Sequence, residues 1–252
     1  MRHTVLLLPF FLISCMNEPE TEAGPTPGTA VPNTAADDYI PLQDTLDARK
    51  AAFEATADPE KKRVYAEGID AVRNSGILEA ARQVGDTAPD FTLNNAIGRP
   101  VRLYDALKNG PVVLTWYRGG WCPYCNLTLH RLQEELPRFR AAGATLLALT
   151  PELPDSSMST TEKHALEFDI LSDIGNGAAR AYGVVFRLTP EVAARYQESF
   201  DLHAYNGNAS NELPLAATYV IDTKGVIRYA FLSPDYRDRA EPRDILEAVR
   251  EL

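Results

Sequence analysis

The amino-acid sequence predicts an α/β fold, in which helices flank a central mixed sheet and a helical extension precedes it. Two observations carry this prediction. After residue 83, short apolar segments rich in β-branched and aromatic residues alternate with helical patterns, which is typical of βαβ units. Before it, between residues 41 and 82, apolar residues recur at helical spacing among charges.

Size and charge limit the possible functions. The chain has 252 residues, of which 45% are hydrophobic, and this suits one main globular domain with an appendage. Its formal net charge is −10, so neither a phosphate backbone nor an anionic membrane surface attracts it. We therefore expect no nucleic-acid partner.

Residues 1–15 have the pattern of a secretory signal. Arg2 and His3 precede an apolar run over residues 5–13, which is too short to span a bilayer. The run ends in Leu12-Ile13-Ser14-Cys15, which resembles the lipobox of bacterial lipoproteins, and the alternative is an ordinary cleaved signal that contains a cysteine. The resemblance implies lipidation of Cys15 and a membrane anchor facing the periplasm, with Met16 favouring the outer membrane.

Two segments separate this signal from the α/β domain. Residues 16–40 form a predicted disordered tether, because residues 16–38 contain four prolines and five acidic residues but no Lys or Arg. Residues 41–82 form the predicted helical extension, divided into two helices at Asp58-Pro59 and ending near Gly76. The extension either caps the domain or mediates dimerisation, and the sequence leaves the oligomeric state open.

The domain itself is predicted over residues 83–252. Short strands occupy its first part, up to residue 103. The later elements, in chain order, are a strand over 112–117, a helix opening at Cys122, a strand over 144–150, a helix from about Ser159, a strand over 169–171, a helix over 177–182, a hairpin over 215–222 and 226–232, and a helix over 242–252.

The sequence Cys122-Pro123-Tyr124-Cys125 stands where the strand over 112–117 gives way to a helix. Pro123 fits the first helical position, where its missing N–H costs nothing. Two thiols at this spacing share one face of the first turn, and we expect Cys122 to be the more exposed. Cys125 begins the apolar stripe, which continues with Leu129, Leu132, Leu136 and Phe139. This arrangement suits a thiol that is oxidised beside a thiol that resolves it.

A thiol reacts as its thiolate, so groups that lower the pKa of Cys122 are of interest. The helix N-terminus favours the anion, and Arg118 is the candidate cation four residues earlier. A second cation could come from the C-terminal arginines, although surface positions are expected for Arg228, Arg237, Arg239 and Arg243. His130 is also expected at the surface.

The cysteine pair could instead be half of a zinc site. Tetrahedral zinc needs four ligands, yet beyond Cys15 and this pair the chain has no cysteine, and after the signal it has only His130, His164 and His203. We therefore expect a redox dithiol, with no metal and no cofactor.

Several motifs in order resemble the peroxiredoxin family of alkyl hydroperoxide reductases and thiol-specific antioxidants, especially its branch with a Cys-x-x-Cys centre. The resemblance runs from about Val84 to the C-terminus. The motifs are Val84-Gly85-Asp86-x-Ala88-Pro89-Asp90-Phe91-Thr92-Leu93, Tyr117-Arg118-Gly119, Trp121-Cys122-Pro123-x-Cys125, Leu171-Ser172-Asp173, Ala181-Tyr182-Gly183-Val184 and Tyr219-Val220-Ile221-Asp222-x-x-Gly225.

This resemblance implies a thioredoxin fold and a thiol-dependent peroxidase. Cys122 matches the peroxidatic cysteine, which becomes a sulfenic acid when it reduces hydrogen peroxide or an organic hydroperoxide. The resolving thiol within the chain is then Cys125, and a thioredoxin-like donor reduces the resulting disulfide.

The sequence also departs from the family pattern. Gly119 and Ala216 stand where typical peroxiredoxins have a Thr and an Arg, which leaves Arg118 to supply the cation. Two rival hypotheses therefore stay open. One is a membrane-anchored thiol–disulfide oxidoreductase that acts on protein disulfides, and the other is a non-catalytic binding lipoprotein.

Overall fold

The computed structural model describes residues 39–252. The predicted signal over 1–15, its Cys15 and nearly all of the tether over 16–40 lie outside the described residues. Within the described part, no helix is long and apolar enough to cross a membrane.

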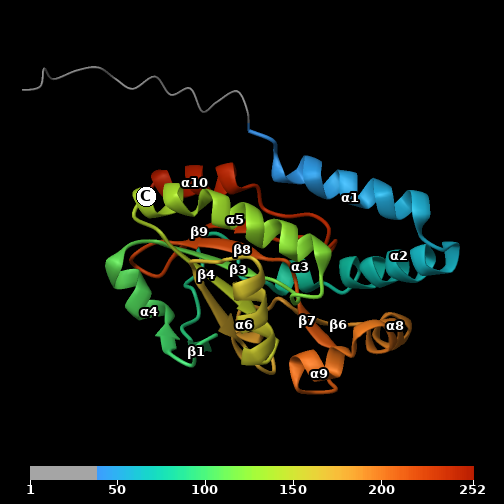
Figure 1. Cartoon of the computed structure of the whole chain (residues 1–252). Helices are drawn as coiled ribbons and strands as arrows, with labels where there is room; N and C mark the ends of the chain where they lie inside the picture. The colour runs from blue at the N-terminus through green and yellow to red at the C-terminus, as the bar shows by residue number, and fades with distance from the viewer. Residues whose placement is uncertain (1–38) are drawn as a thin grey trace, which may run out of the picture. The chain divides into compact units, whose positions relative to one another are not determined.

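The domain is built on a seven-stranded sheet in the order β2-β1-β5-β4-β3-β8-β9 (Figure 1). Strands β3, β4 and β5 pair in parallel, whereas the other pairings are antiparallel, so the predicted mixed sheet is confirmed. A separate pair joins β6 and β7. The strands are β1 (Thr92–Asn95), β2 (Pro100–Arg102), β3 (Val112–Trp116), β4 (Thr145–Thr150), β5 (Asp169–Ser172), β6 (Val185–Arg187), β7 (Glu212–Pro214), β8 (Thr218–Ile221) and β9 (Ile227–Phe231).

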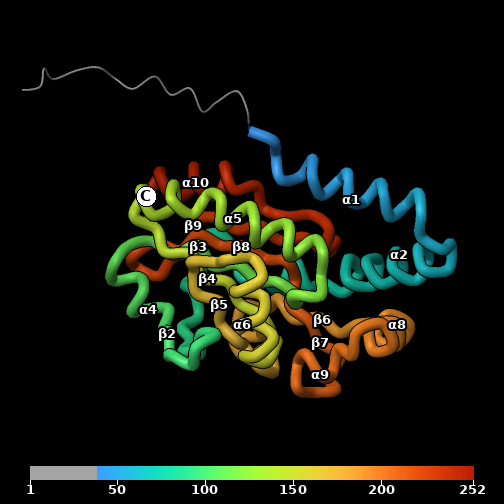
Figure 2. Tube along the Cα trace, viewed as in Figure 1, coloured from blue at the N-terminus to red at the C-terminus, as the bar shows by residue number. Residues whose placement is uncertain are grey.

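The helices include the predicted extension, and the chain can be followed through them in Figure 2. A short 3₁₀ turn over Leu107–Asn109 follows α4. The helices are α1 (Leu42–Thr56), α2 (Pro59–Arg73), α3 (Ile77–Ala80), α4 (Leu103–Ala106), α5 (Pro123–Ala141), α6 (Pro154–Lys163), α7 (Gly177–Ala181), α8 (Pro190–Phe200), α9 (Leu202–Asn206) and α10 (Pro242–Arg250).

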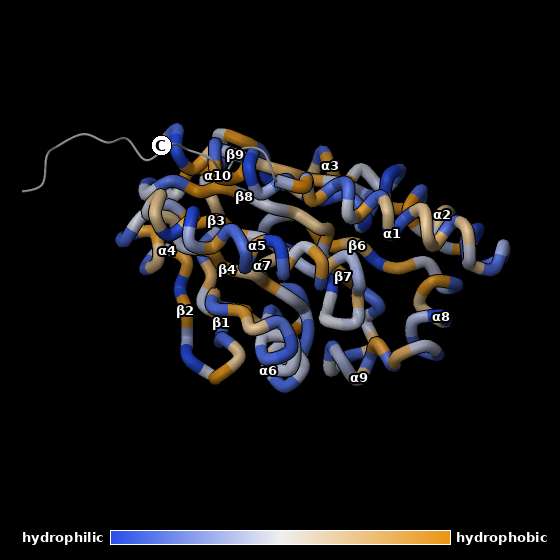
Figure 3. The backbone as a smooth tube through the Cα atoms, turned by 45° about the horizontal axis from the view of Figure 1, so that its top comes forward, coloured by the Kyte–Doolittle hydropathy of each residue, from blue (hydrophilic) through white to orange (hydrophobic). Residues whose placement is uncertain are grey.

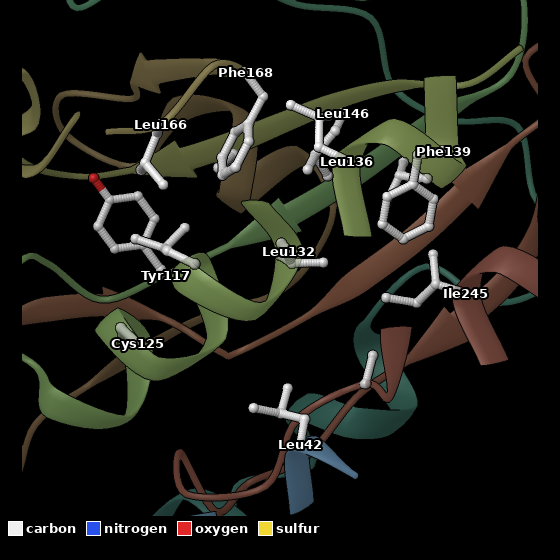
Figure 4. Packing of buried hydrophobic residues seen from close by; sticks show 14 of the residues in the cluster. Leu42, Tyr117, Cys125, Leu132, Leu136, Phe139, Leu146, Leu166, Phe168 and Ile245 are labelled. Carbon is white, nitrogen blue, oxygen red and sulfur yellow. The ribbon is translucent and has the colours of Figure 1, made fainter. Parts of the chain in front are cut away.

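Alternation along the strands divides the core between the two faces of the sheet. In β3, Val113 joins a cluster formed with α1, α5 and α10, whereas Val112 and Leu114 join one formed with α3, α4 and α7. Figure 4 shows the apolar stripe of α5 in the first cluster. Cys125 belongs to that stripe, so the packing of α5 fixes the second thiol against the sheet.

The extension packs against the domain. Leu42 and Leu46 of α1 are buried beside α5, and Val64 of α2 is buried in a cluster with residues of α8. Asp58 caps α2 by accepting hydrogen bonds from the backbone N–H groups of Glu60 and Lys61. The helices thus cover the side of the domain where α5 begins.

Three parts of the domain differ from the prediction. Helix α4 over Leu103–Ala106 was not predicted. Helix α6 begins at Pro154 rather than near Ser159, and Figure 3 shows it as a mainly hydrophilic segment, which explains why its apolar periodicity is weak. Residues 185–214 contain β6, α8, α9 and β7, none of which was predicted. Thr189 caps α8 through its side chain, and Pro190 takes the first helical position.

Candidate active site

The dithiol is positioned by β3 on one side and α5 on the other. Every residue of β3 is buried, and Tyr117 extends its pairing by donating to the carbonyl of Leu149. The Cys122 N–H then donates to the Gly119 carbonyl over 3.0 Å, closing a turn. Cys122 is the N-cap of α5, and Pro123 occupies the first helical position, as predicted.

Gly119 has a structural reason to replace the Thr of typical peroxiredoxins. Its φ is +152°, and a Cβ there would lie 2.2 Å from Nε1 of Trp121. A residue with a side chain would therefore collide with the indole. The close approach lets Trp121 lie over the turn that precedes Cys122.

The expected contrast in exposure between the two thiols is wrong. Both are buried, with 1% of Cys122 and none of Cys125 exposed. The thiols differ in access instead, because Cys122 lines a cavity of about 400 Å³ that Cys125 does not line. This cavity, called here the cysteine cavity, is lined by parts of α1, α2 and α8, by Arg118, by residues 121–124 and by Tyr236.

The two thiols ionise as a pair. Burial, then the hydrogen bond to Cys125 and its charge, raise the pKa of Cys122. Burial opposes ionisation of Cys125 as well, but the hydrogen bond from Cys122 and the guanidinium groups of Arg239 and Arg118 lower its pKa below the ordinary value. The guanidinium of Arg239, which contacts the Sγ of Cys125, therefore favours the negative charge of the ionised pair on Cys125.

Arg118 lies close to the dithiol and does not point to solvent. It is 1% exposed, its Nη2 donates to the Tyr196 hydroxyl, and its guanidinium carbon lies 4.0 Å from the centre of the Tyr236 ring. The Trp121 ring stands on another side, at 5.0 Å. Aromatic faces thus hold the cation in a site where burial alone would disfavour it. Its catalytic role stays a prediction.

The expected surface position of Arg239 is wrong. It is 6% exposed, and its Nη2 donates to the Sγ of Cys125 over 3.4 Å. The other C-terminal arginines lie elsewhere: Arg228 pairs with Asp222 at 2.7 Å, Arg237 pairs with Asp235 at 2.8 Å, and Arg243 is exposed on α10. Two buried arginines therefore flank the dithiol.

A buried carboxyl group completes the site. Glu152 is fully buried, and its Oε1 accepts from the Gly120 N–H over 3.0 Å in the turn before Cys122. Thr150 donates to its other oxygen over 3.3 Å. Burial raises the pKa of Glu152 to about 7, with the charge of Cys125 acting in the same direction. This carboxyl group can exchange a proton near neutral pH.

The histidines lie away from the cysteine pair. His130 is exposed, as expected, with its Nε2 3.3 Å from Glu134, and His203 contacts Asn211. None of the three described histidines lines the cysteine cavity. Over residues 39–252, no group of three or more His, Cys, Asp or Glu side chains has the arrangement of a metal site.

Several site residues were absent from the prediction. Tyr196 and Phe200 follow Val192 at helical spacing after Thr189-Pro190, a pattern that would have identified α8. Glu152 lies two residues after the end of the buried strand β4, and a polar residue at that position could have been predicted as a site residue. Tyr236 comes from the loop after β9, where the sequence has no periodicity to reveal it.

Comparison with known proteins gives consistent matches. The AhpC/TSA family profile matches residues 84–230. The chain is 29% identical over 147 residues to a chloroplast peroxiredoxin Q of Sedum lineare, covering 58% of this chain and 67% of that protein. A putative peroxiredoxin Q of Oryza sativa subsp. indica is 27% identical over 207 residues, covering 82% and 79%.

Among solved structures, peroxidoxin BcpB from Mycobacterium tuberculosis superimposes with a TM-score of 0.56 at 23% identity. The match covers 68% of this chain and 97% of that one. This likeness confirms the expected thioredoxin fold. The helices α1 and α2 lie before the segment that the family profile matches.

Proposed function

We propose, from the premise that this chain belongs to the AhpC/TSA family of peroxiredoxins and is a thiol-dependent peroxidase, that Cys122 attacks the peroxide and Cys125 resolves the product. The observation that carries this assignment is the cysteine cavity, which reaches Cys122 and not Cys125. The substrates are hydrogen peroxide or organic hydroperoxides, and the reductant is a thioredoxin-like dithiol.

The ionised pair supplies the nucleophile. The proton on Cys122 moves to Cys125, and the Cys122 thiolate attacks one peroxide oxygen. An S–O bond forms, the O–O bond breaks, and the leaving oxygen takes a proton from solvent, so that water or an alcohol departs. Cys122 is then a sulfenic acid.

Cys125 completes the cycle within the chain. Its thiolate attacks the Cys122 sulfur, so that an S–S bond forms, the S–O bond breaks and the hydroxyl group leaves as water. The carboxyl group of Glu152 is the nearby buried acceptor for the proton that Cys125 releases, and it passes that proton to the departing hydroxyl group. A donor dithiol returns the pair to two thiols and is itself oxidised.

Access also favours a peroxide over a protein disulfide as the oxidising substrate. A peroxide can enter the cavity, whereas a disulfide on a folded protein cannot reach a sulfur that is 1% exposed. Reduction of the Cys122–Cys125 disulfide by a protein donor therefore requires the first turn of α5 to open.

A competition assay tests the proposal. The reduced protein is mixed with equal concentrations of hydrogen peroxide and oxidised insulin, and the loss of each is followed with dithiothreitol as the reductant. We expect rapid peroxide loss that depends on Cys122, with little reduction of insulin. Insulin reduction without peroxide loss would favour the thiol–disulfide oxidoreductase.

We also propose the lipid anchor at Cys15, which rests on the Leu12-Ile13-Ser14-Cys15 sequence alone. Fractionation of cells that express the Cys15→Ala variant tests it. The parent should sediment with membranes, most of them outer membranes, and the variant should not. Equal membrane retention of the two proteins would contradict the anchor.

A further inference from the structure

The geometry points to helices α1 and α2 as one wall of the substrate site, selecting an organic hydroperoxide with an apolar body and an anionic group. We infer this from the shape, lining and charge of the cysteine cavity. The inference rests on the peroxidase function proposed above and specifies its substrate class.

The wall comes from outside the segment that the family profile matches. Phe53 of α1 and Tyr65 of α2 line the cavity and stack on each other, with ring centres 5.9 Å apart. Trp121, also in the lining, stacks on Phe200 of α8 with ring centres 4.5 Å apart, and Cys122 follows Trp121 in the chain. The reactive sulfur therefore shares a largely aromatic cavity with the extension.

The size of the cavity exceeds what hydrogen peroxide needs. Its volume of about 400 Å³ is within the range of sites for small organic molecules, about 300 to 1,000 Å³. Hydrogen peroxide is close to a water molecule in size, and water has a share of about 30 Å³ in the liquid. The remaining volume, with its aromatic lining, suits an apolar body attached to the peroxide.

The charge of the lining opposes the charge of the whole chain. The protein has 35 acidic and 25 basic residues, yet the cavity is lined by Arg49, Lys61 and Arg118 and by no Asp or Glu. Arg118 is buried in its aromatic cage, whereas Arg49 is exposed and Lys61 is half-buried. Neither Arg49 nor Lys61 forms an ion pair with a carboxylate in the described part of the chain.

These two cations are placed to meet an anionic group. Arg49 comes from α1 and Lys61 from the first turn of α2, on the two helices of the extension. Each can contribute a charge-assisted hydrogen bond to a carboxylate while the peroxide end of the same molecule lies at Cys122. Helix α1 packs against α5 and helix α2 packs against α8, as can be followed in Figure 1, so both helices of the extension lie beside elements that line the cysteine cavity.

A matched pair of peroxides tests the inference. The probes are cumene hydroperoxide, its derivative with a carboxylate on the ring para to the peroxide-bearing carbon, and hydrogen peroxide, with dithiothreitol as the reductant. The quantity compared is the ratio of kcat/KM for the anionic probe to that for neutral cumene hydroperoxide. In the parent this ratio should exceed one, despite the net charge of −10.

Charge-removing variants locate the selectivity. Arg49→Ala and Lys61→Ala should each lower the ratio by about threefold, and the double variant by about tenfold. The control Arg250→Ala removes the same charge from an exposed position on α10 outside the cavity, and its ratio should equal that of the parent. Salt provides the same test without a substitution: because it screens exposed charges, 0.5 M NaCl should lower the ratio of the parent.

A second variant tests the apolar wall without changing charge. Ala52 of α1 is exposed and lines the cavity, so Ala52→Trp should fill part of it. The kcat/KM for cumene hydroperoxide should then fall about tenfold relative to that for hydrogen peroxide.

The outcomes separate the two proposals. A ratio that is at or below one in the parent, or that falls equally in Arg250→Ala and in the double variant, overturns the inference and leaves the peroxidase function standing. A parent that consumes none of the three peroxides overturns the proposed function itself.

Discussion

Arg239 donates a hydrogen bond from its Nη2 to the Sγ of Cys125 over 3.4 Å, and both side chains are buried. The guanidinium also donates to the carbonyl of Asp238 over 2.8 Å, so the loop after β9 holds it in place. A buried cation in contact with the resolving sulfur favours the thiolate there. The negative charge of the ionised pair is therefore stabilised on Cys125, which is the thiol that does not line the cysteine cavity.

Replacing Arg239 with Ala should raise the pKa of Cys125 by about one to two, because its largest favourable charge is removed while burial remains. Arg239→Lys should restore part of the effect, since the charge stays but the forked geometry is lost. The pH dependence of thiolate absorbance at 240 nm measures the change. Arg228→Ala, which removes an exposed arginine bound to Asp222, is the control and should titrate like the parent.

Arg118→Ala should affect both stability and chemistry. Removing a desolvated cation from between Tyr196, Tyr236 and Trp121 should cost about 2 kcal/mol of unfolding free energy. The pH profile of kcat/KM for hydrogen peroxide should also shift to higher pH, because Arg118 opposes the effect of burial on Cys122. Arg118→Lys should recover part of the pH shift. A variant that is less stable but has an unshifted profile would make Arg118 purely structural.

Glu152 should make the protein less stable as pH rises from 4.5 to 7. The pKa of Glu152 is about 7 in the folded chain against an ordinary value of 4.5, so in this range the folded state holds a proton that the unfolded state has released. The stabilising contribution is complete below pH 4.5 and is lost as pH rises through 7. Glu152→Gln should remove this dependence.

Urea unfolding of the parent and of Glu152→Gln at pH values from 4 to 8 measures it. The difference between their unfolding free energies should change by about 3 kcal/mol across the range, with the parent losing stability relative to the variant as pH rises. Titrating groups that do not interact with Glu152 cancel in this difference. Parallel curves for the two proteins would show that Glu152 titrates normally.

Local patterns predicted the elements that carry the dithiol. The run of buried residues in β3, Pro123 at the first helical position and the stripe from Cys125 to Phe139 each follow from spacing and residue type. The contacts that tune the thiols did not follow from such patterns. Arg239 reaches Cys125 across 114 residues of sequence, and an arginine in a polar loop is ordinarily a surface residue.

Helix α8 could have been predicted from local patterns, but its contacts with the site could not. Its start signal and its periodic Val192, Tyr196 and Phe200 were present in the sequence and went unused. The contact between Tyr196 and Arg118 depends on how α8 packs on α2. No local sequence pattern predicts that packing. Burial of Cys122 is likewise a tertiary effect, since the extension and α8 cover a helix start that is locally exposed.

The order of attack is tested most directly by mass spectrometry of the two single-cysteine variants after one equivalent of hydrogen peroxide. Cys125→Ser should complete one turnover and form a sulfenic acid on Cys122, detected as its dimedone adduct, because Cys122 is the thiol of the pair that lines the cavity. Cys122→Ser should consume no peroxide and gain no oxygen. An oxygen found on Cys125 in Cys122→Ser, at the rate of the parent, would contradict the assignment and reverse the two roles.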